Sequence, residues 1–255
     1  MNFILRKISV ALAYIVMIIV NYLANALPIN NIDTGAVSDL YPNLFAPAGI
    51  TFSIWGIIYL LLGLFVLYQF GTFKKISLKE DKLLNKISIY FIISSVFNAL
   101  WIFSWHYGLL WVSIIFMLGI LFCLIKINLL IRKNKFKDFF FLSLPFSIYF
   151  GWITVATIAN FTALLVSFGW SGFGVSESIW TIAILLVGTI IGILTSIRNK
   201  DIAYILVFAW AYFGIIIKHT SVLGFNNQYP EIITAASICI ALFLITIGYL
   251  WFRKA

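Results

Sequence analysis

The sequence predicts an all-α integral membrane protein with eight transmembrane helices. Of its 255 residues, 63% are hydrophobic and only 10% are charged, and the mean hydropathy is +1.09, whereas soluble domains are about 45–50% apolar. A helix needs about 20 consecutive apolar residues to cross a bilayer, and such runs recur along the chain between short polar breaks. A transmembrane barrel would show short alternating segments instead, so helices are the predicted spanning elements.

Each predicted helix fills one apolar run and ends at a polar break. The eight helices are placed at residues 8–27, 50–70, 87–105, 109–130, 139–162, 179–197, 202–217 and 231–251. The polar break at residues 74–86 mixes charges of both signs with apolar residues, which predicts a separate short helix at the membrane surface.

The basic residues alternate from break to break. With Lys126 near the inner end of its helix, 16 of the 17 Lys and Arg fall on one side, at the termini or at every second break, and Lys218 is the exception. The 16 are Arg6, Lys7, Lys74, Lys75, Lys79, Lys82, Lys86, Lys126, Arg132, Lys133, Lys135, Lys137, Arg198, Lys200, Arg253 and Lys254. The positive-inside rule places this side, with both termini, in the cytoplasm. The net charge of +9 thus reflects topology, and the lipid bilayer is the expected partner, not nucleic acid.

Residue types that support catalysis or metal binding do not form a cluster in the sequence. Cys123 and Cys239 lie inside apolar runs, which favours packing over a disulfide or a metal site. His106 and His219 lie in different breaks and are interpreted as polar turn residues. All eight acidic residues lie in breaks or at helix ends, so the chain lacks the intramembrane carboxylate typical of proton-coupled transport. We therefore expect neither an enzyme nor a bound cofactor or metal.

The longest outer break covers residues 28–48 and contains Asp39, Pro42 and Pro47. Proline fixes the backbone and biases the preceding residue away from the helix. The two prolines therefore predict a shaped lid over the outer end of the helices, and a flexible connector is the alternative.

Three helices carry motifs that resemble the TspO/MBR family, the tryptophan-rich sensory proteins that include the mitochondrial translocator protein. The matching positions are Pro47, Trp55, Gly56, Tyr59 and Gly63 in the second helix, Asn98 and Trp101 in the third, and Tyr149, Trp152, Ala156, Thr157 and Asn160 in the fifth. The chain departs from the family pattern at Ala46, which replaces the first of two prolines, and at Pro145, which lies three residues early.

The resemblance implies a five-helix core at residues 1–165 and a three-helix C-terminal extension at residues 166–255, which the short members lack. It also implies a ligand site formed by Trp55, Tyr59, Asn98, Trp101, Tyr149, Trp152, Ala156 and Asn160. Aromatic walls suit flat conjugated ligands, and the two amides can bind a polar edge. Without the resemblance, packing and helix-to-helix hydrogen bonding would be the preferred roles of such residues in membrane helices.

By resemblance, the protein is expected to lie in the inner membrane of a bacterial cell. The resemblance also implies that it binds a planar hydrophobic ligand such as haem or protoporphyrin, or a sterol-like lipid. A transporter of small hydrophobic molecules is the alternative, although the sequence shows neither intramembrane charges nor a repeat between its halves. A membrane enzyme would need His106, Asp33 or Asp39 as a general acid or base. Gly188 and Gly192 form a GxxxG motif, which favours packing within the chain over a homodimer contact.

Overall fold

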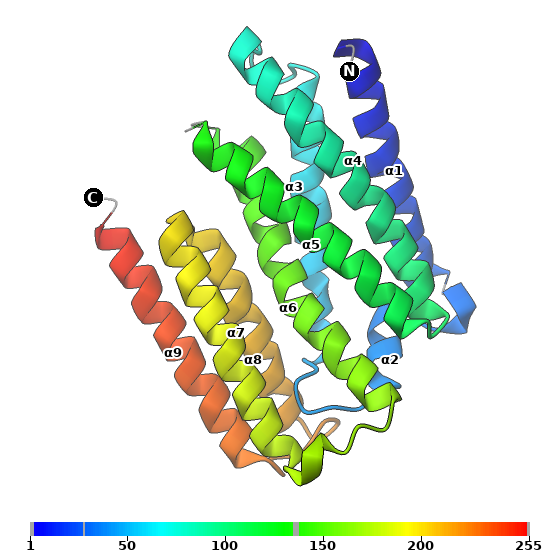
Figure 1. The fold of residues 1–255 in the computed structure, drawn as a ribbon, viewed down its shortest axis with the longest axis vertical. Helices are drawn as coiled ribbons and strands as arrows, with labels where there is room; N and C mark the ends of the chain where they lie inside the picture. Colours follow the sequence, from blue (N-terminus) through cyan, green and yellow to red (C-terminus); the bar gives the residue numbers. More distant parts are fainter. Residues whose placement is uncertain (1–2, 28, 135–137, 254–255) are drawn as a thin grey trace. The chain divides into compact units, whose positions relative to one another are not determined.

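The computed structural model describes residues 3–27, 29–134 and 138–253. Among these residues, eight helices are long and apolar enough to cross a membrane, and no strand occurs (Figure 1). The prediction of an all-α membrane protein with eight spans is therefore confirmed. Lys135, Lys137 and Lys254, which were assigned to the basic side, lie outside the described residues, as does Pro28 at the start of the outer break.

The helices follow the predicted order, and each occupies one of the apolar runs. The spanning helices are α1 (Phe3–Ala26), α3 (Ile54–Gln69), α4 (Leu78–His106), α5 (Leu110–Lys133), α6 (Leu144–Ser167), α7 (Glu177–Asn199), α8 (Ile202–Thr220) and α9 (Pro230–Phe252). Four short elements accompany them: η1 (Ile29–Asn31), α2 (Thr34–Asp39), η2 (Gly49–Ser53) and η4 (Gly172–Gly174). A single-turn π-helix, η3 (Phe139–Ser143), leads directly into α6.

The prediction of a separate surface helix in the second break is wrong, because α4 begins at Leu78 and continues without interruption into the membrane span. Ser77 forms a capping box with Glu80: the Ser77 amide donates to Glu80 Oε2 at 2.7 Å, and the Glu80 amide donates to Ser77 Oγ at 3.3 Å. A capping box starts a helix, and neither Gly nor Pro follows within this segment to end it.

The described contacts divide the chain into two compact units. The first contains Met1–Thr34 and Ile54–Ile153, and the second contains Gly35–Ser53 and Thr154–Ala255, so that the division passes through α6. The predicted boundary at residue 165 concerned the extent of the family core, and it stays a prediction.

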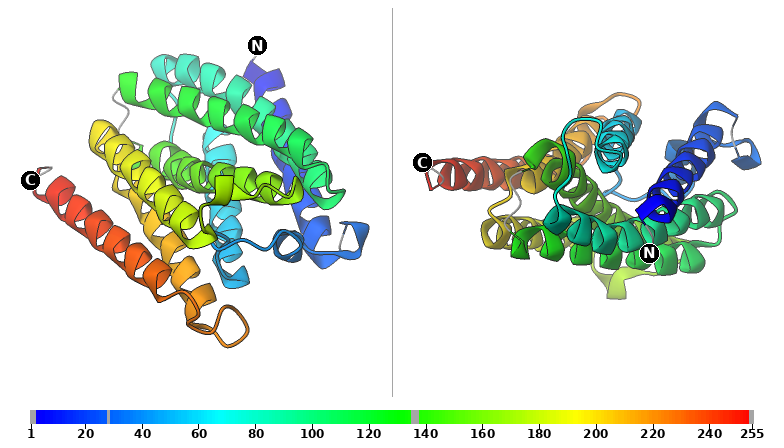
Figure 2. Two further views of the ribbon diagram at one scale, coloured as in Figure 1. Left: turned by 60° about the horizontal axis from the view of Figure 1, so that its bottom comes forward. Right: turned by 90° about the horizontal axis from the view of Figure 1, so that it is seen from above.

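Within the first unit, α1 packs against α3 and α4, and α4 and α5 form an antiparallel hairpin (Figure 2). Two polar pairs join α1 to α4. Asn21 Nδ2 donates to Asn98 Oδ1 at 2.6 Å, and Arg6 Nη2 donates to Asp81 Oδ1 at 2.6 Å. A hydrogen bond between side chains of two membrane helices stabilises their association by about 0.6–2 kcal/mol, so these pairs fix the position of α1.

The loop after α3 is tied to the start of the π-helix through Lys74. Lys74 Nζ lies 2.8 Å from Asp138 Oδ2 and also contacts Glu80, and the Tyr68 hydroxyl donates to the same Asp138 oxygen at 2.8 Å. The hydrogen bonds to Asp138 and Glu80 raise the pKa of Lys74 above its ordinary value. The Lys74 ammonium therefore has a local structural role besides its contribution to topology.

Within the second unit, α8 and α9 pack along each other, and α7 packs against both (Figure 1). Gly188 faces the hydroxyl of Tyr212, and a Cβ at Gly192 would lie 3.2 Å from the ring of Phe208 and 3.4 Å from that of Phe243. The GxxxG motif therefore permits close packing within the chain, as predicted. The homodimer stays a prediction.

Candidate functional site

Four aromatic side chains of the first unit meet around a fifth, Trp55, and we call the five rings the aromatic cluster: Trp55, Tyr59, Trp101, Tyr149 and Trp152. The centroid of the Trp55 ring lies 5.4 Å from that of Tyr59, 6.1 Å from Trp101, 6.0 Å from Tyr149 and 6.2 Å from Trp152. The rings come from α3, α4 and α6. Three of the predicted helix faces therefore converge, with Trp55 as the ring that all the others contact.

Helical spacing explains how the sequence presents these rings. Residues three or four apart on a helix share a face. Trp55 and Tyr59 are four apart on α3 and stack with an interplanar angle of 20°. Tyr149 and Trp152 are three apart on α6, and both present an edge to the Trp55 ring, with interplanar angles of 63° and 85°. Stacked and edge-to-face pairs are the two favoured arrangements of aromatic rings.

Asn98 lies beside the cluster and is fully buried. Its Oδ1 accepts from Asn21, and its Nδ2 donates to the Tyr149 hydroxyl at 3.3 Å. The amide predicted to bind a ligand therefore also links α1, α4 and the first turns of α6.

Two hydrogen-bond donors in the cluster lack a partner. The Tyr59 hydroxyl and the Trp101 indole nitrogen are both buried, and neither forms a hydrogen bond within the part of the chain that the structure describes. Buried polar groups are hydrogen-bonded in the large majority of cases, and leaving one unsatisfied costs about 1–3 kcal/mol. Two such groups in one cluster are the feature of this site that packing alone does not explain.

The TSPO-like protein family model matches residues 7–249. The chain belongs to the TSPO-like protein family. The family predicted from the motifs on three helices is thus confirmed, and the match includes the C-terminal helices α7 and α8 and most of α9. No curated protein and no solved structure matches the chain. The family and the membrane-spanning helices together establish a multi-pass TSPO-like membrane protein.

Two predicted ligand residues of this TSPO-like chain, Ala156 and Asn160, lie in the second unit on the later turns of α6. Asn160 is buried and Ala156 is half-buried. Their roles in ligand binding stay predictions. Among the described residues, no group of three His, Cys, Asp or Glu side chains could hold a metal ion.

The outer segment with the predicted lid residues is held by α8 within the second unit. Asp39 Oδ1 accepts from Lys218 Nζ at 2.8 Å, and the Ala48 amide donates to the Gly214 carbonyl at 3.0 Å. His219 Nε2 lies 2.9 Å from the Leu44 carbonyl oxygen, to which it donates. We call residues 42–53, which include Pro42 and the buried Pro47, the outer strap. These contacts give the strap a defined shape, and its role as a lid stays a prediction.

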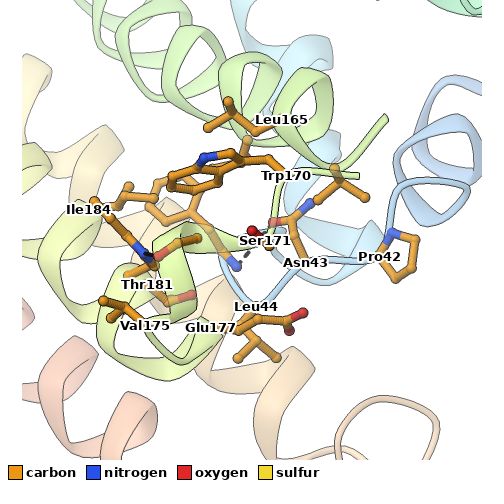
Figure 3. A pocket seen from close by; sticks show the side chains of 15 residues that line it. Pro42, Asn43, Leu44, Leu165, Trp170, Ser171, Val175, Glu177, Thr181 and Ile184 are labelled. Atoms are coloured by element: carbon orange, nitrogen blue, oxygen red, sulfur yellow. Dashed lines mark hydrogen bonds between the residues drawn. The ribbon is translucent and has the colours of Figure 1, made fainter. Parts of the chain in front are cut away.

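A pocket of about 170 Å³ lies in the second unit of this TSPO-like protein (Figure 3). Its lining comes from the outer strap, the end of α6, the turn that follows α6 and the first turns of α7. The chemically distinctive lining residues are Trp170, Trp180 and Glu177. The sequence predicts no site here. The signal that could have indicated one is the pair of tryptophans on either side of the glycine-containing turn at residues 171–174.

Proposed function

We propose that this TSPO-like protein binds a planar hydrophobic ligand at the aromatic cluster, and that a tetrapyrrole such as haem or protoporphyrin is the class it takes. The observation that carries the proposal is the pair of buried donors without partners, Tyr59 OH and Trp101 Nε1, beside rings that converge from three helices. A tetrapyrrole offers a flat conjugated ring to stack on aromatic side chains, and its carboxylates accept hydrogen bonds.

Trp55 is the ring that a ligand would displace. It is half-buried, whereas Trp101 and Trp152 are 5% and 3% exposed. A planar ligand that replaced the Trp55 indole would contact the rings of Trp101, Tyr149 and Trp152, which Trp55 contacts in this structure. A sterol-like lipid has no conjugated ring to stack there, so it would gain less from these walls than a tetrapyrrole.

The test is a titration of the purified protein in detergent with protoporphyrin, read from the absorbance of the porphyrin itself. Tyr59→Phe and Trp101→Phe each remove one unpartnered donor and keep an aromatic ring. We expect each to weaken binding by about 10- to 150-fold, because a hydrogen bond to a charged acceptor contributes about 1.5–3 kcal/mol. Because binding is measured from porphyrin absorbance, the loss of a tryptophan and its fluorescence does not affect the measurement.

Matched controls are Tyr22→Phe and Trp111→Phe, since these side chains are 66% and 59% exposed on α1 and α5 and lie outside the cluster. Both controls should bind porphyrin like the wild type. Equal affinities for the cluster variants and the controls, or binding that does not saturate, would show that the ligand does not use this cluster.

A further inference from the structure

Among the described residues, Glu177 is the one charged residue that lines the pocket of the second unit. Glu177 is exposed and forms no hydrogen bond or ion pair within the described part of the chain. The side-chain oxygen of Asn43, which also lines the pocket, already accepts two hydrogen bonds, from the backbone amides of Phe45 and Ala46 at 3.1 and 2.9 Å. The pocket therefore presents a carboxylate that has no counter-charge of its own.

The aromatic wall of the pocket is built by two tryptophans that meet at an angle. The Trp170 and Trp180 ring centroids are 5.0 Å apart, and the rings are inclined at 58°. The indole nitrogen of Trp180 donates to the Gly172 carbonyl at 2.8 Å. Gly172 has a φ of +64°, and a Cβ there would lie 3.0 Å from the Trp180 ring, so a glycine is needed for the turn to lie against this indole.

Figure 3 shows how the lining elements surround the pocket: Asn43 and Pro42 lie on one side, Thr181 and Ile184 of α7 on the other, and Trp170 between them. We propose that this pocket binds an organic ammonium ion. The negative face of an indole attracts cations, and aromatic cages recognise quaternary ammonium ligands in this way. The Glu177 carboxylate adds a negative charge to the two indoles of this pocket.

The size and charge of the pocket argue against other ligands. A cavity of about 150 Å³ accommodates benzene, whereas drug-sized ligands occupy about 300–1,000 Å³, so a pocket of about 170 Å³ takes a small ammonium group and not a tetrapyrrole. An anion would be attracted by the amino end of α7, but Glu177 already places its carboxylate at this end, and the Ser176 side chain accepts from the Ile179 amide. This site shares no residue with the aromatic cluster and does not depend on the proposed function.

The test uses two probes of the same shape, choline and its uncharged isostere 3,3-dimethylbutan-1-ol, in calorimetric titrations of the purified full chain at constant ionic strength. We expect saturable binding of choline and roughly tenfold weaker binding of the alcohol, because the alcohol lacks the charge that indole faces and a carboxylate attract. Glu177→Gln should weaken choline binding by a similar factor and leave the binding of the alcohol unchanged.

Asp201→Asn is the matched control, since it removes one negative charge from the same unit at a residue that does not line the pocket, and asparagine can keep the cap on the Tyr204 amide. It should bind choline like the wild type, and melting temperatures will show that both variants fold. Equal binding of the two probes, or a Glu177→Gln variant that binds choline normally, would overturn the proposal.

The ammonium group could belong to a free amine or to the headgroup of a choline lipid. Choline titrations of the protein in lipid bilayer discs distinguish these two ligands. Choline titrations in discs of phosphatidylcholine and of an uncharged glycolipid should give the same affinity if the ligand is a free amine. Weaker apparent affinity for choline in phosphatidylcholine would identify the lipid headgroup as the ligand, because the lipid would compete for the pocket.

Discussion

Asp81→Ala is expected to lower the free energy of unfolding by about 3 kcal/mol, because it removes the carboxylate that pairs with a buried guanidinium. The Arg6 side chain is 1% exposed, and its Nη2 lies 2.6 Å from Asp81 Oδ1. In the variant, Arg6 Nη1 can still donate a hydrogen bond to the backbone carbonyl of residue 81, which lies 3.0 Å away. Arg6 Nε has no hydrogen-bond partner among the described residues even in the wild type. The expected loss is at the lower end of the usual range of about 3–5 kcal/mol, since the Asp81 side chain is 34% exposed.

The measurement is the apparent melting temperature in detergent, which should fall by roughly 6–12 °C. Asp39→Ala is the control, because it breaks a more exposed pair, in which the Asp39 and Lys218 side chains are 61% and 23% exposed, and it should cost at most about 1 kcal/mol. The double variant Arg6→Met/Asp81→Ala should be more stable than Asp81→Ala, since no buried charge is left unpaired. A double variant less stable than the single one, or equal losses for Asp81→Ala and Asp39→Ala, would contradict this account.

The spanning helices could be predicted from the sequence because long apolar runs and charged breaks are local features. The first turns of α4 were missed for the same reason: residues 78–86 are charged, but the cap at Ser77 joins them to the apolar run that follows. From the sequence, Arg6 is only a charge that indicates topology, and Asp81 is only an acidic residue in the second break. Their pairing depends on α1 lying against α4, which no local pattern encodes.

The aromatic cluster and the pocket of the second unit differ in how far each could be predicted from the sequence. Trp55, Trp101 and Trp152 each lie in a family motif, so the motifs singled out these residues, although only the structure shows that their rings meet. Trp170 and Trp180 lie in no such motif, and the pocket exists because the outer strap folds onto a turn far away in the sequence. Contacts at such separations depend on tertiary packing, which spacing within one helix does not reveal.

The second prediction with a large effect concerns Gly214 of α8, which lies directly against the outer strap. A Cβ at this position would contact Thr51 Oγ1 and would lie 2.8 Å from Thr51 Cγ2 and 2.9 Å from Thr51 Cβ. Rotation of the Thr51 side chain cannot relieve a contact with its own Cβ, so Gly214→Ala must push the strap away from the helix. We expect a net loss of about 2 kcal/mol in the free energy of unfolding, since overpacking costs about 1–3 kcal/mol or occasionally more, and alanine recovers up to about 1 kcal/mol of helix propensity.

Two hydrogen bonds should weaken together in Gly214→Ala, because both cross the same contact: the Ala48 amide donates to the Gly214 carbonyl at 3.0 Å, and the Trp210 indole donates to the Thr51 carbonyl at 2.9 Å. Gly248→Ala on α9 is the matched control, since nothing lies within 4 Å of its added Cβ, and its melting temperature should not fall. Thr51→Gly removes the opposing Cβ, so combining it with Gly214→Ala should cost less than the sum of the two single losses. Strictly additive losses, or a Gly214→Ala variant as stable as Gly248→Ala, would show that the strap does not depend on this close approach.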